Sequence, residues 1–289
     1  MTNADEGARR GVVMIMLAGT FWSLQGPTIR FIEVAESSQI VFWRSVSQTI
    51  SILIIVAVVN KGRVFRAFRQ AGVAGLIGGL CGLGAGTSFV FALGQTTVAN
   101  VVFIMAASPL FAALLAWLSM GERLERGSYV SMVLAIAGIG VMVSEGLRTG
   151  DILGYVYAIA TTICFAGIAV VARYGRGLSM LPATCIGAML TMPFAFWLSA
   201  GSIAIPLHEI GLAFISGGLL TAIGATLFLL GAKYVPAGPL AFLSLTEIVL
   251  APIWVWWVFA EVPSRTTLLG GAVVLSALVI EGTRRARLR

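Results

Sequence analysis

The chain has 289 residues, of which 58% are hydrophobic and 11% charged, and its mean hydropathy is +0.98. A soluble protein carries about 25% charged residues, so the composition excludes a water-soluble globular protein and indicates an integral membrane protein. The formal charge of +7 does not indicate a nucleic-acid partner, because the basic residues lie in short connections between apolar runs.

Ten apolar runs follow one another along the chain, each about long enough to cross a hydrocarbon core of roughly 30 Å as a helix. Backbone polar groups in lipid must be paired within their own segment, so we expect every run to be helical. The first run is longer than the apolar region of a signal peptide and is predicted to be an uncleaved span. The predicted spans cover residues 11–32, 38–59, 71–93, 98–120, 128–144, 152–172, 180–200, 208–231, 237–260 and 266–282.

Lys and Arg are distributed unevenly between the two sides that ten crossings define. Fifteen of the 19 lie in the termini or in connections on the terminal side, and only Arg148 and Arg265 lie in connections on the other side. Arg30 and Arg44 lie within spans. Since basic residues accumulate in cytoplasmic loops, we predict a bacterial-type inner (plasma) membrane protein with both termini cytoplasmic.

Residues 99–122 have a counterpart in residues 238–261. Aligning the two segments places Phe103 against Phe242, Trp117 against Trp256, and Glu122 against Glu261. The alignment predicts two five-span repeats, residues 1–146 and 147–289, and because five is odd the second repeat is inverted. The predicted fold class is therefore an all-α integral membrane protein, with ten transmembrane helices as two inverted five-helix repeats around a central cavity.

Small residues and prolines interrupt the apolar runs. Glycines four residues apart in the third run allow close helix approach, either as static packing or as a sliding surface for rocking; these alternatives stay open. The predicted hinge and packing positions are Pro27, Gly78, Gly82, Pro109, Gly217 and Pro252.

Arg44 lies about six residues into the second run, with Gln48 one turn further on. A charged residue inside a span is costly and usually faces the bundle interior or a water-filled cavity. We expect Arg44 to anchor an anion or to form a structural ion pair. The alternative is that its side chain snorkels to the membrane surface.

Glu247 lies near the middle of the ninth run, with Ser244 one turn before it. We expect Glu247 to bind the amino group of a substrate or to carry a proton. The alternative is a permanently paired or protonated residue that stabilises the bundle. Further interior polar and aromatic residues complete the predicted substrate cavity: Trp22, Gln25, Ser88, Asn100, Phe103, Tyr157, Thr161, Phe165 and Phe242.

Catalytic and cofactor motifs are missing from the sequence. There is no GxxxxGK[ST] phosphate loop, and the single histidine, His208, excludes a Ser-His-Asp triad. Cys81, Cys164 and Cys185 lie inside apolar runs without metal-ligand spacing and are expected to be unpaired core residues. Three tryptophans in residues 254–257 are expected at the outer membrane interface. We therefore predict no enzyme activity, no cofactor and no metal site.

Three segments resemble the ten-span EamA-type family of the drug/metabolite transporter superfamily. They are VFWRS around Arg44, residues 91–124 (FALGQTTVANVVFIMAASPLFAALLAWLSMGERL), and a weaker counterpart at residues 230–262. In that counterpart Ile248 replaces the proline aligned with Pro109. The resemblance implies a cavity lined by spans one to four and six to nine, with the fifth and tenth peripheral. It also implies metabolite export, most similar to amino acid exporters of the YddG type.

The sequence therefore predicts a secondary transporter or facilitator that exports small amphipathic metabolites by alternating access. Aromatic amino acids are the leading candidates, and we expect a functional monomer in the lipid bilayer. One alternative is proton-coupled efflux of cationic drugs, although the first span has no acidic residue before Glu33. A second alternative is a structural or regulatory membrane subunit without transport of its own.

Overall fold

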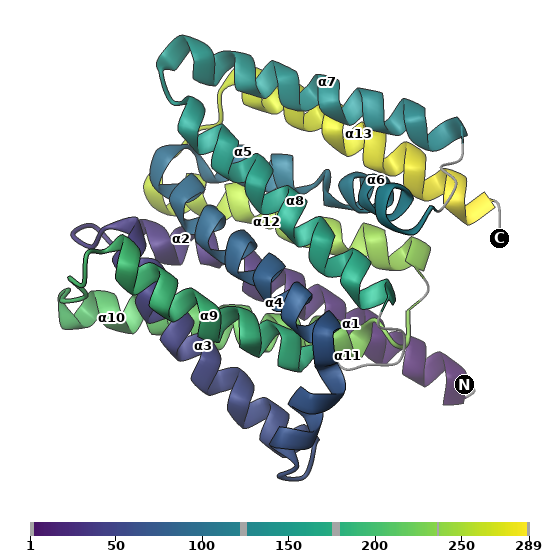
Figure 1. Cartoon of the computed structure of the whole chain (residues 1–289). Coiled ribbons are helices and arrows are strands. Elements are labelled where there is room, and N and C mark those ends of the chain that lie inside the picture. The colour runs from purple at the N-terminus through teal and green to yellow at the C-terminus, as the bar shows by residue number, and fades with distance from the viewer. Residues whose placement is uncertain (1–2, 122–125, 175–179, 236, 288–289) are drawn as a thin grey trace.

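A computed structural model of the chain describes residues 3–121, 126–174, 180–235 and 237–287. These residues form helices joined by short connections, and the termini lie at the same end of the bundle (Figure 1). The helices are α1 (Asn3–Ser23), α2 (Gln25–Arg30), α3 (Ser37–Val59), α4 (Val64–Gln95), α5 (Val98–Met105), α6 (Ser108–Met120), α7 (Arg126–Thr149), α8 (Ile152–Tyr174), α9 (Leu181–Leu198), α10 (Leu207–Phe214), the π-helix η1 (Ile215–Thr221), α11 (Ala222–Gly231), α12 (Ala237–Phe259) and α13 (Arg265–Arg287).

Every predicted apolar run coincides with helix, which confirms the all-α class. Within the described residues, eight helices are long and apolar enough to cross a membrane, and the bent pair α5 and α6 makes nine. The apolar segment found in α12, Leu245–Phe259, is shorter than the 18 residues expected of a membrane-spanning helix. The tenth crossing therefore stays a prediction.

Prolines mark two of the breaks in these helices. The first span is interrupted at Leu24, because Pro27 has no N–H to donate to the carbonyl of Ser23 in the preceding turn. The fourth span bends by 41° between α5 and α6, and Pro109 lies in the first turn of α6. Pro252, in contrast, lies inside the continuous helix α12.

Helices of the first half of the chain pack against helices of the second half. α4 packs against α8 and α9, α1 packs against α11 and α12, and α7 packs along α13 at the edge of the bundle (Figure 1). Gly11 at the start of the first span lies against Gly231 and Tyr234 at the end of α11. Gly154 at the start of α8 lies in the same way against Gln95 and Thr96 at the end of α4. Each half thus begins against the third span of the other, which is the geometry of an inverted repeat.

The predicted packing glycines lie at close contacts between helices. A Cβ on Gly78 would lie 3.2 Å from Met180 Cε of α9, and one on Gly82 would lie 3.7 Å from the Cα of Gly187. A Cβ on Gly217 would lie 2.5 Å from Ser47 Oγ of α3. These contacts show close packing, while sliding along them stays a prediction.

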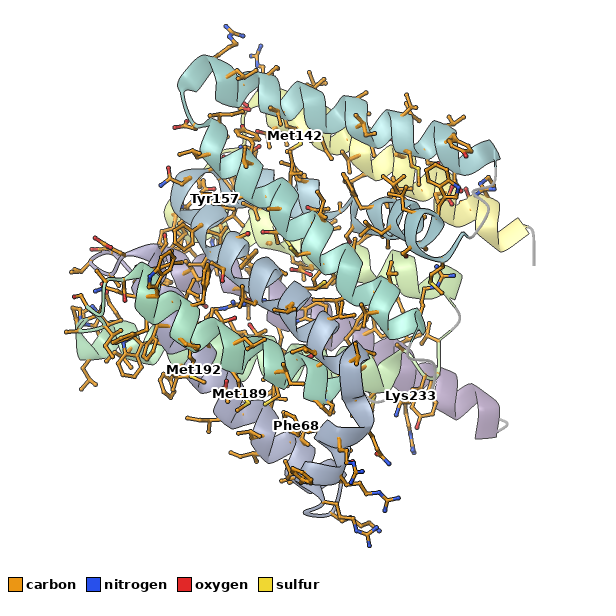
Figure 2. The ribbon with its side chains drawn as sticks, in the orientation of Figure 1. Phe68, Met142, Tyr157, Met189, Met192 and Lys233 are labelled. Carbon is orange, nitrogen blue, oxygen red and sulfur yellow. The ribbon has the colours of Figure 1, made fainter. Side chains whose placement is uncertain are left out.

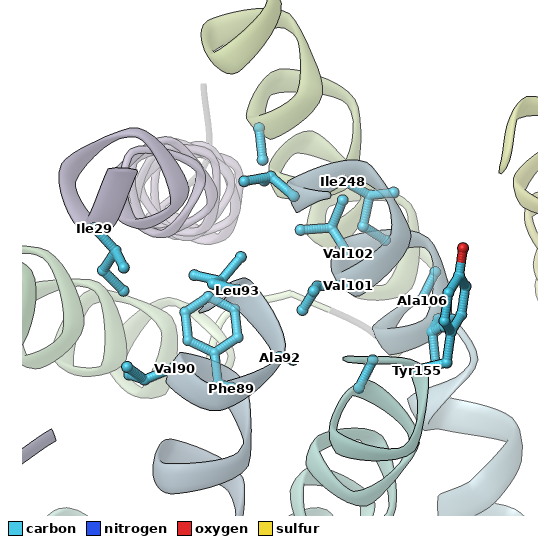
Figure 3. Packing of buried hydrophobic residues seen from close by; sticks show 14 of the residues in the cluster. Ile29, Phe89, Val90, Ala92, Leu93, Val101, Val102, Ala106, Tyr155 and Ile248 are labelled. Carbon is cyan, nitrogen blue, oxygen red and sulfur yellow. The ribbon is translucent and has the colours of Figure 1, made fainter. Parts of the chain in front are cut away.

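The largest buried cluster joins both halves of the chain. Figure 3 shows Phe89 and Leu93 of α4 between Ile29 of α2 and Val101 of α5, with Ile248 of α12 close by. Since lipid tails are as apolar as these side chains, close van der Waals packing stabilises this cluster more than removal from water does. The three cysteines are free, as predicted.

Candidate functional site

Arg44 of α3 is held at the centre of a polar cluster in the bundle. Its side chain is buried, and Nη2 donates hydrogen bonds to Gln25 Oε1 at 2.7 Å and to Thr221 Oγ1 at 3.0 Å. Its Cζ lies 5.8 Å from the ring centroid of Phe89 on α4, within the range of a cation–π contact. The burial excludes snorkelling to the surface.

The charge of this guanidinium is not balanced by a neighbouring carboxylate. Within the described part of the chain, Arg44 forms no ion pair, and its Nε has no hydrogen-bond partner. Both partners of Nη2 are neutral. An uncompensated buried cation is costly, typically several kcal/mol, so an anionic group that reached Arg44 would be bound favourably.

Both neutral partners come from irregular helical segments. Gln25 is the first residue of α2, directly after the break at Leu24, and Thr221 is the last residue of the π-helix η1. Thr221 Oγ1 also lies 2.7 Å from Ser216 O and 3.0 Å from Gln25 Oε1, and its one proton can serve one of them at a time. π-Helices frequently occur at functional sites, and broken helices form the binding sites of many transporters.

Two aromatic rings pack against Trp22, which lies three residues before Gln25 in the first span. Trp22 of α1 meets Phe165 of α8 edge-on at 6.5 Å between centroids, and Phe228 of α11 at 5.4 Å. Tyr157 of α8 packs on Phe91 at 5.4 Å, toward the end of the bundle opposite Lys233 (Figure 2). Thr161, also predicted for the cavity, is buried and donates to the carbonyl of Tyr157 at 2.8 Å.

Glu247 lies on the face of α12 that packs against α1. A Cβ on Gly19 would lie 3.4 Å from Glu247 N, and one turn beyond Gly19, Ser23 Oγ accepts a 3.0 Å hydrogen bond from Trp254 Nε1. The Glu247 side chain is partly buried and has no hydrogen-bond or ion-pair partner among the residues the structure describes. A permanent ion pair is therefore not found.

Three further predictions concern α12. Trp254 donates to Ser23 of α1, whereas Trp256 and Trp257 are exposed; their position at the outer membrane interface stays a prediction. The side chains of Phe242 and Ser244 lie outside the described part of the structure.

Asn100 of α5 lines the second of two cavities at the end of the bundle opposite the termini, and Phe103 contacts α13; a role of either residue in binding substrate stays a prediction. Asn100 is buried; its Nδ2 donates to Tyr155 OH at 2.8 Å, and its Oδ1 accepts from Thr267 Oγ1 of α13 at 2.7 Å. Phe103 packs against Gly271 of α13. This face of α5 therefore lies toward the tenth span, α13. Gln48 of α3 and Ser88 of α4 are partly buried and have no hydrogen-bond partner among the described residues.

Two cavities, of about 580 and 520 Å³, open at the end of the bundle opposite the termini. Both are lined by Arg30, Gly94 and Gln95. The first cavity reaches Ile40 and Val90, so Arg44 lies one turn deeper along α3. Neither cavity includes Arg44 or Glu247 in its lining.

Two polar contacts at the same end were not predicted from the sequence. Arg30 Nε forms a 3.0 Å ion pair with Glu261 Oε2. The buried carboxylate of Glu209 accepts hydrogen bonds from three successive backbone N–H groups, those of residues 33–35. The position of Arg30 inside an apolar run was a signal for the first contact, whereas the sequence around Glu209 carries none.

Comparison with known proteins agrees with this architecture. The model of the EamA-like transporter family matches residues 9–144 and again residues 152–281. The pseudopaline exporter CntI of Pseudomonas aeruginosa (strain UCBPP-PA14) is 25% identical over 285 residues, which cover 94% of this chain and 95% of that protein. The S-adenosylmethionine uptake transporter of Rickettsia prowazekii is 27% identical over 201 residues, which cover 66% of this chain and 65% of that protein.

A solved crystal structure superposes with a TM-score of 0.65 at 18% identity, covering 93% of this chain and 96% of that one, and supports the fold alone. The family model matches the chain twice, and the second match begins at residue 152, where the sixth span (α8) also begins. The chain is thus a multi-pass membrane transporter that belongs to the EamA-like transporter family of the drug/metabolite transporter superfamily.

Proposed function

We propose that this transporter exports small amphipathic metabolites that carry a carboxylate, by alternating access, and that aromatic amino acids are its leading substrates. The observation that carries the proposal is the buried guanidinium of Arg44, whose hydrogen-bond partners within the described residues, Gln25 and Thr221, are neutral. The inverted repeat supports alternating access, because exchanging the conformations of the two halves exchanges the open face.

In the proposed binding mode, the substrate carboxylate accepts a hydrogen bond from Nε of Arg44, which has no hydrogen-bond partner within the described residues. Guanidinium–carboxylate pairs are among the strongest hydrogen-bonded contacts in proteins because both groups are charged. Gln25 and Thr221 accept from Nη2 and fix the plane of the guanidinium. Trp22 and Phe165 supply an apolar wall for the side chain of the substrate.

Glu247 completes the proposed site by binding the ammonium group of the substrate. A mostly apolar site with a few polar anchors is the usual pattern for small-molecule binding. The predicted orientation, with cytoplasmic termini in an inner membrane, is supported by the distribution of Lys and Arg. One chain contains both family repeats, which supports a functional monomer.

Counterflow in vesicles containing the purified protein tests this function. Labelled phenylalanine should enter vesicles loaded with phenylalanine, and phenylethylamine, which lacks the carboxylate, should not compete. The variant Arg44→Gln should lower the rate about 10- to 100-fold, since a hydrogen bond to a charged group contributes roughly 1.5–3 kcal/mol. The exposed Arg66→Gln is the matched control. Full counterflow in Arg44→Gln would contradict the proposal.

Proton-coupled efflux of cationic drugs is the second candidate, favoured by the unpartnered carboxyl of Glu247 in the described residues. It predicts counterflow of tetraphenylphosphonium that Arg44→Gln leaves intact and Glu247→Gln abolishes. The opposite pattern, phenylalanine flux that depends on Arg44, favours the amino acid. A structural subunit predicts no flux of either compound.

A further inference from the structure

Arg30 connects three segments at the mouth of the bundle opposite the termini. Its Nη1 donates to Leu93 O at 2.8 Å and its Nη2 donates to Thr96 O at 2.7 Å, where α4 ends. Its Nε forms the ion pair with Glu261 in the connection between α12 and α13. One guanidinium therefore joins the ends of α2 and α4 to the second half of the chain.

Glu261 makes a second contact across the same boundary. While its Oε2 pairs with Arg30, its Oε1 accepts a 2.7 Å hydrogen bond from the backbone N–H of Val98, the first residue of α5. Arg30 and Val98 lie in the first family match and Glu261 lies in the second. The contacts of Glu261 with Arg30 and Val98 thus hold the two repeats together at one mouth.

The pair also lies where an opening would form. Arg30 lines both cavities at this mouth, so its side chain is part of the wall between them. The side chains of Arg30 and Glu261 are 27% and 19% exposed. An ion pair in contact with water is weak, so thermal motion can separate it repeatedly.

The repeat places an equivalent arginine at the other mouth. Gly11, Trp22 and Arg30 have the same spacing as Gly154, Phe165 and Arg173, and the two glycines make the equivalent contacts described above. Arg173 lies at the end of α8, which the inverted repeat directs toward the termini (Figure 1). A substitution of Arg173 can therefore serve as a control for a substitution at the mouth where Arg30 lies.

We propose that the Arg30–Glu261 pair is a latch that closes the mouth opposite the termini, and that it separates each time this mouth opens. The proposal rests on the alternating access of the proposed function and adds the contact that controls one of its two states. Separation of the pair frees the α12–α13 connection from the ends of α2 and α4 and joins the two cavities.

Labelling of a single cysteine measures this opening without a substrate. The reporter is Val90→Cys, in a chain whose native cysteines are replaced by alanine, because Val90 lines the first cavity and is 1% exposed. A membrane-impermeant maleimide is added from the side of this mouth. The variant Glu261→Gln removes the ion pair but keeps an oxygen to accept from the N–H of Val98.

Glu261→Gln should raise the labelling rate roughly two- to five-fold, because loss of a weak, partly exposed ion pair shifts a two-state equilibrium by about that factor. The exposed Glu33→Gln, which removes an equal charge at the same mouth, and Arg173→Gln, at the other mouth, should not raise it.

Unchanged labelling in Glu261→Gln, or an equal rise in Glu33→Gln, would overturn the latch. The comparison uses variants that elute from a sizing column as the parent does. The substrate proposal fails separately, because absence of phenylalanine counterflow leaves the labelling result intact.

Discussion

The contact between η1 and α3 makes Gly217→Ala the most informative single substitution. A Cβ at this position would collide with the carbonyl oxygen of Arg44 and lie 2.8 Å from its carbonyl carbon, whereas ordinary contacts begin at 3.4 Å. Because the colliding atoms belong to the backbone of α3, they cannot rotate away. The two helices must separate by roughly 1 Å, and overpacking of this kind costs about 1–3 kcal/mol.

Two effects follow from that separation. The intrinsic helix preference of alanine over glycine offsets about 1 kcal/mol of this cost, so the net change is a destabilisation of about 0–2 kcal/mol. In addition, the 3.0 Å hydrogen bond between Arg44 and Thr221 lengthens, so transport should fall further than stability.

Thermal unfolding of the purified protein, followed by loss of the monodisperse sizing peak, measures the first effect, and counterflow measures the second. Gly211→Ala is the matched control, since Gly211 precedes Gly217 in the same predicted span and has nothing within 4 Å of an added Cβ. Equal melting temperatures and equal transport for the two variants would refute the reasoning.

Two further substitutions test polar contacts away from Arg44. Glu209→Gln should destabilise the protein by roughly 1.5–3 kcal/mol, because an amide NH₂ would then face a backbone N–H of residues 33–35; a melting temperature equal to that of Glu33→Gln would contradict this. Asn100→Ala and Thr267→Val should be coupled by about 0.5–3 kcal/mol in a double-mutant cycle, since their side chains share a buried 2.7 Å hydrogen bond. Strict additivity of the two melting shifts would exclude that coupling.

The positions of the helices could be predicted from the sequence, because transfer of a residue to lipid is a property of that residue and its neighbours. Every apolar run became helix, and prolines at 27 and 109 lie at or just after the breaks of the first and fourth spans. The π-helix η1 was not predicted, since an i to i+5 hydrogen bond leaves no pattern in hydrophobicity.

The candidate site was predicted only in part. Arg44 was assigned to the interior from its charge inside an apolar run, and the structure places it there. Asn100 and Phe103 were also predicted to line the substrate cavity, but in the structure both residues contact α13. The hydrogen bond of Trp254 to Ser23 of α1 was not predicted, because it joins residues far apart in the sequence.

By itself the sequence determined that this chain is a helical membrane protein built from two repeats, because hydrophobicity and internal similarity are read along the chain. Only the tertiary structure decided which side chains meet: Gln25 and Thr221 reach one arginine from distant segments, and Arg30 reaches Glu261. The physical reason is that such contacts depend on the rotation and register of one helix against another. In lipid these are set by the shape of the packed surfaces, which no single segment contains.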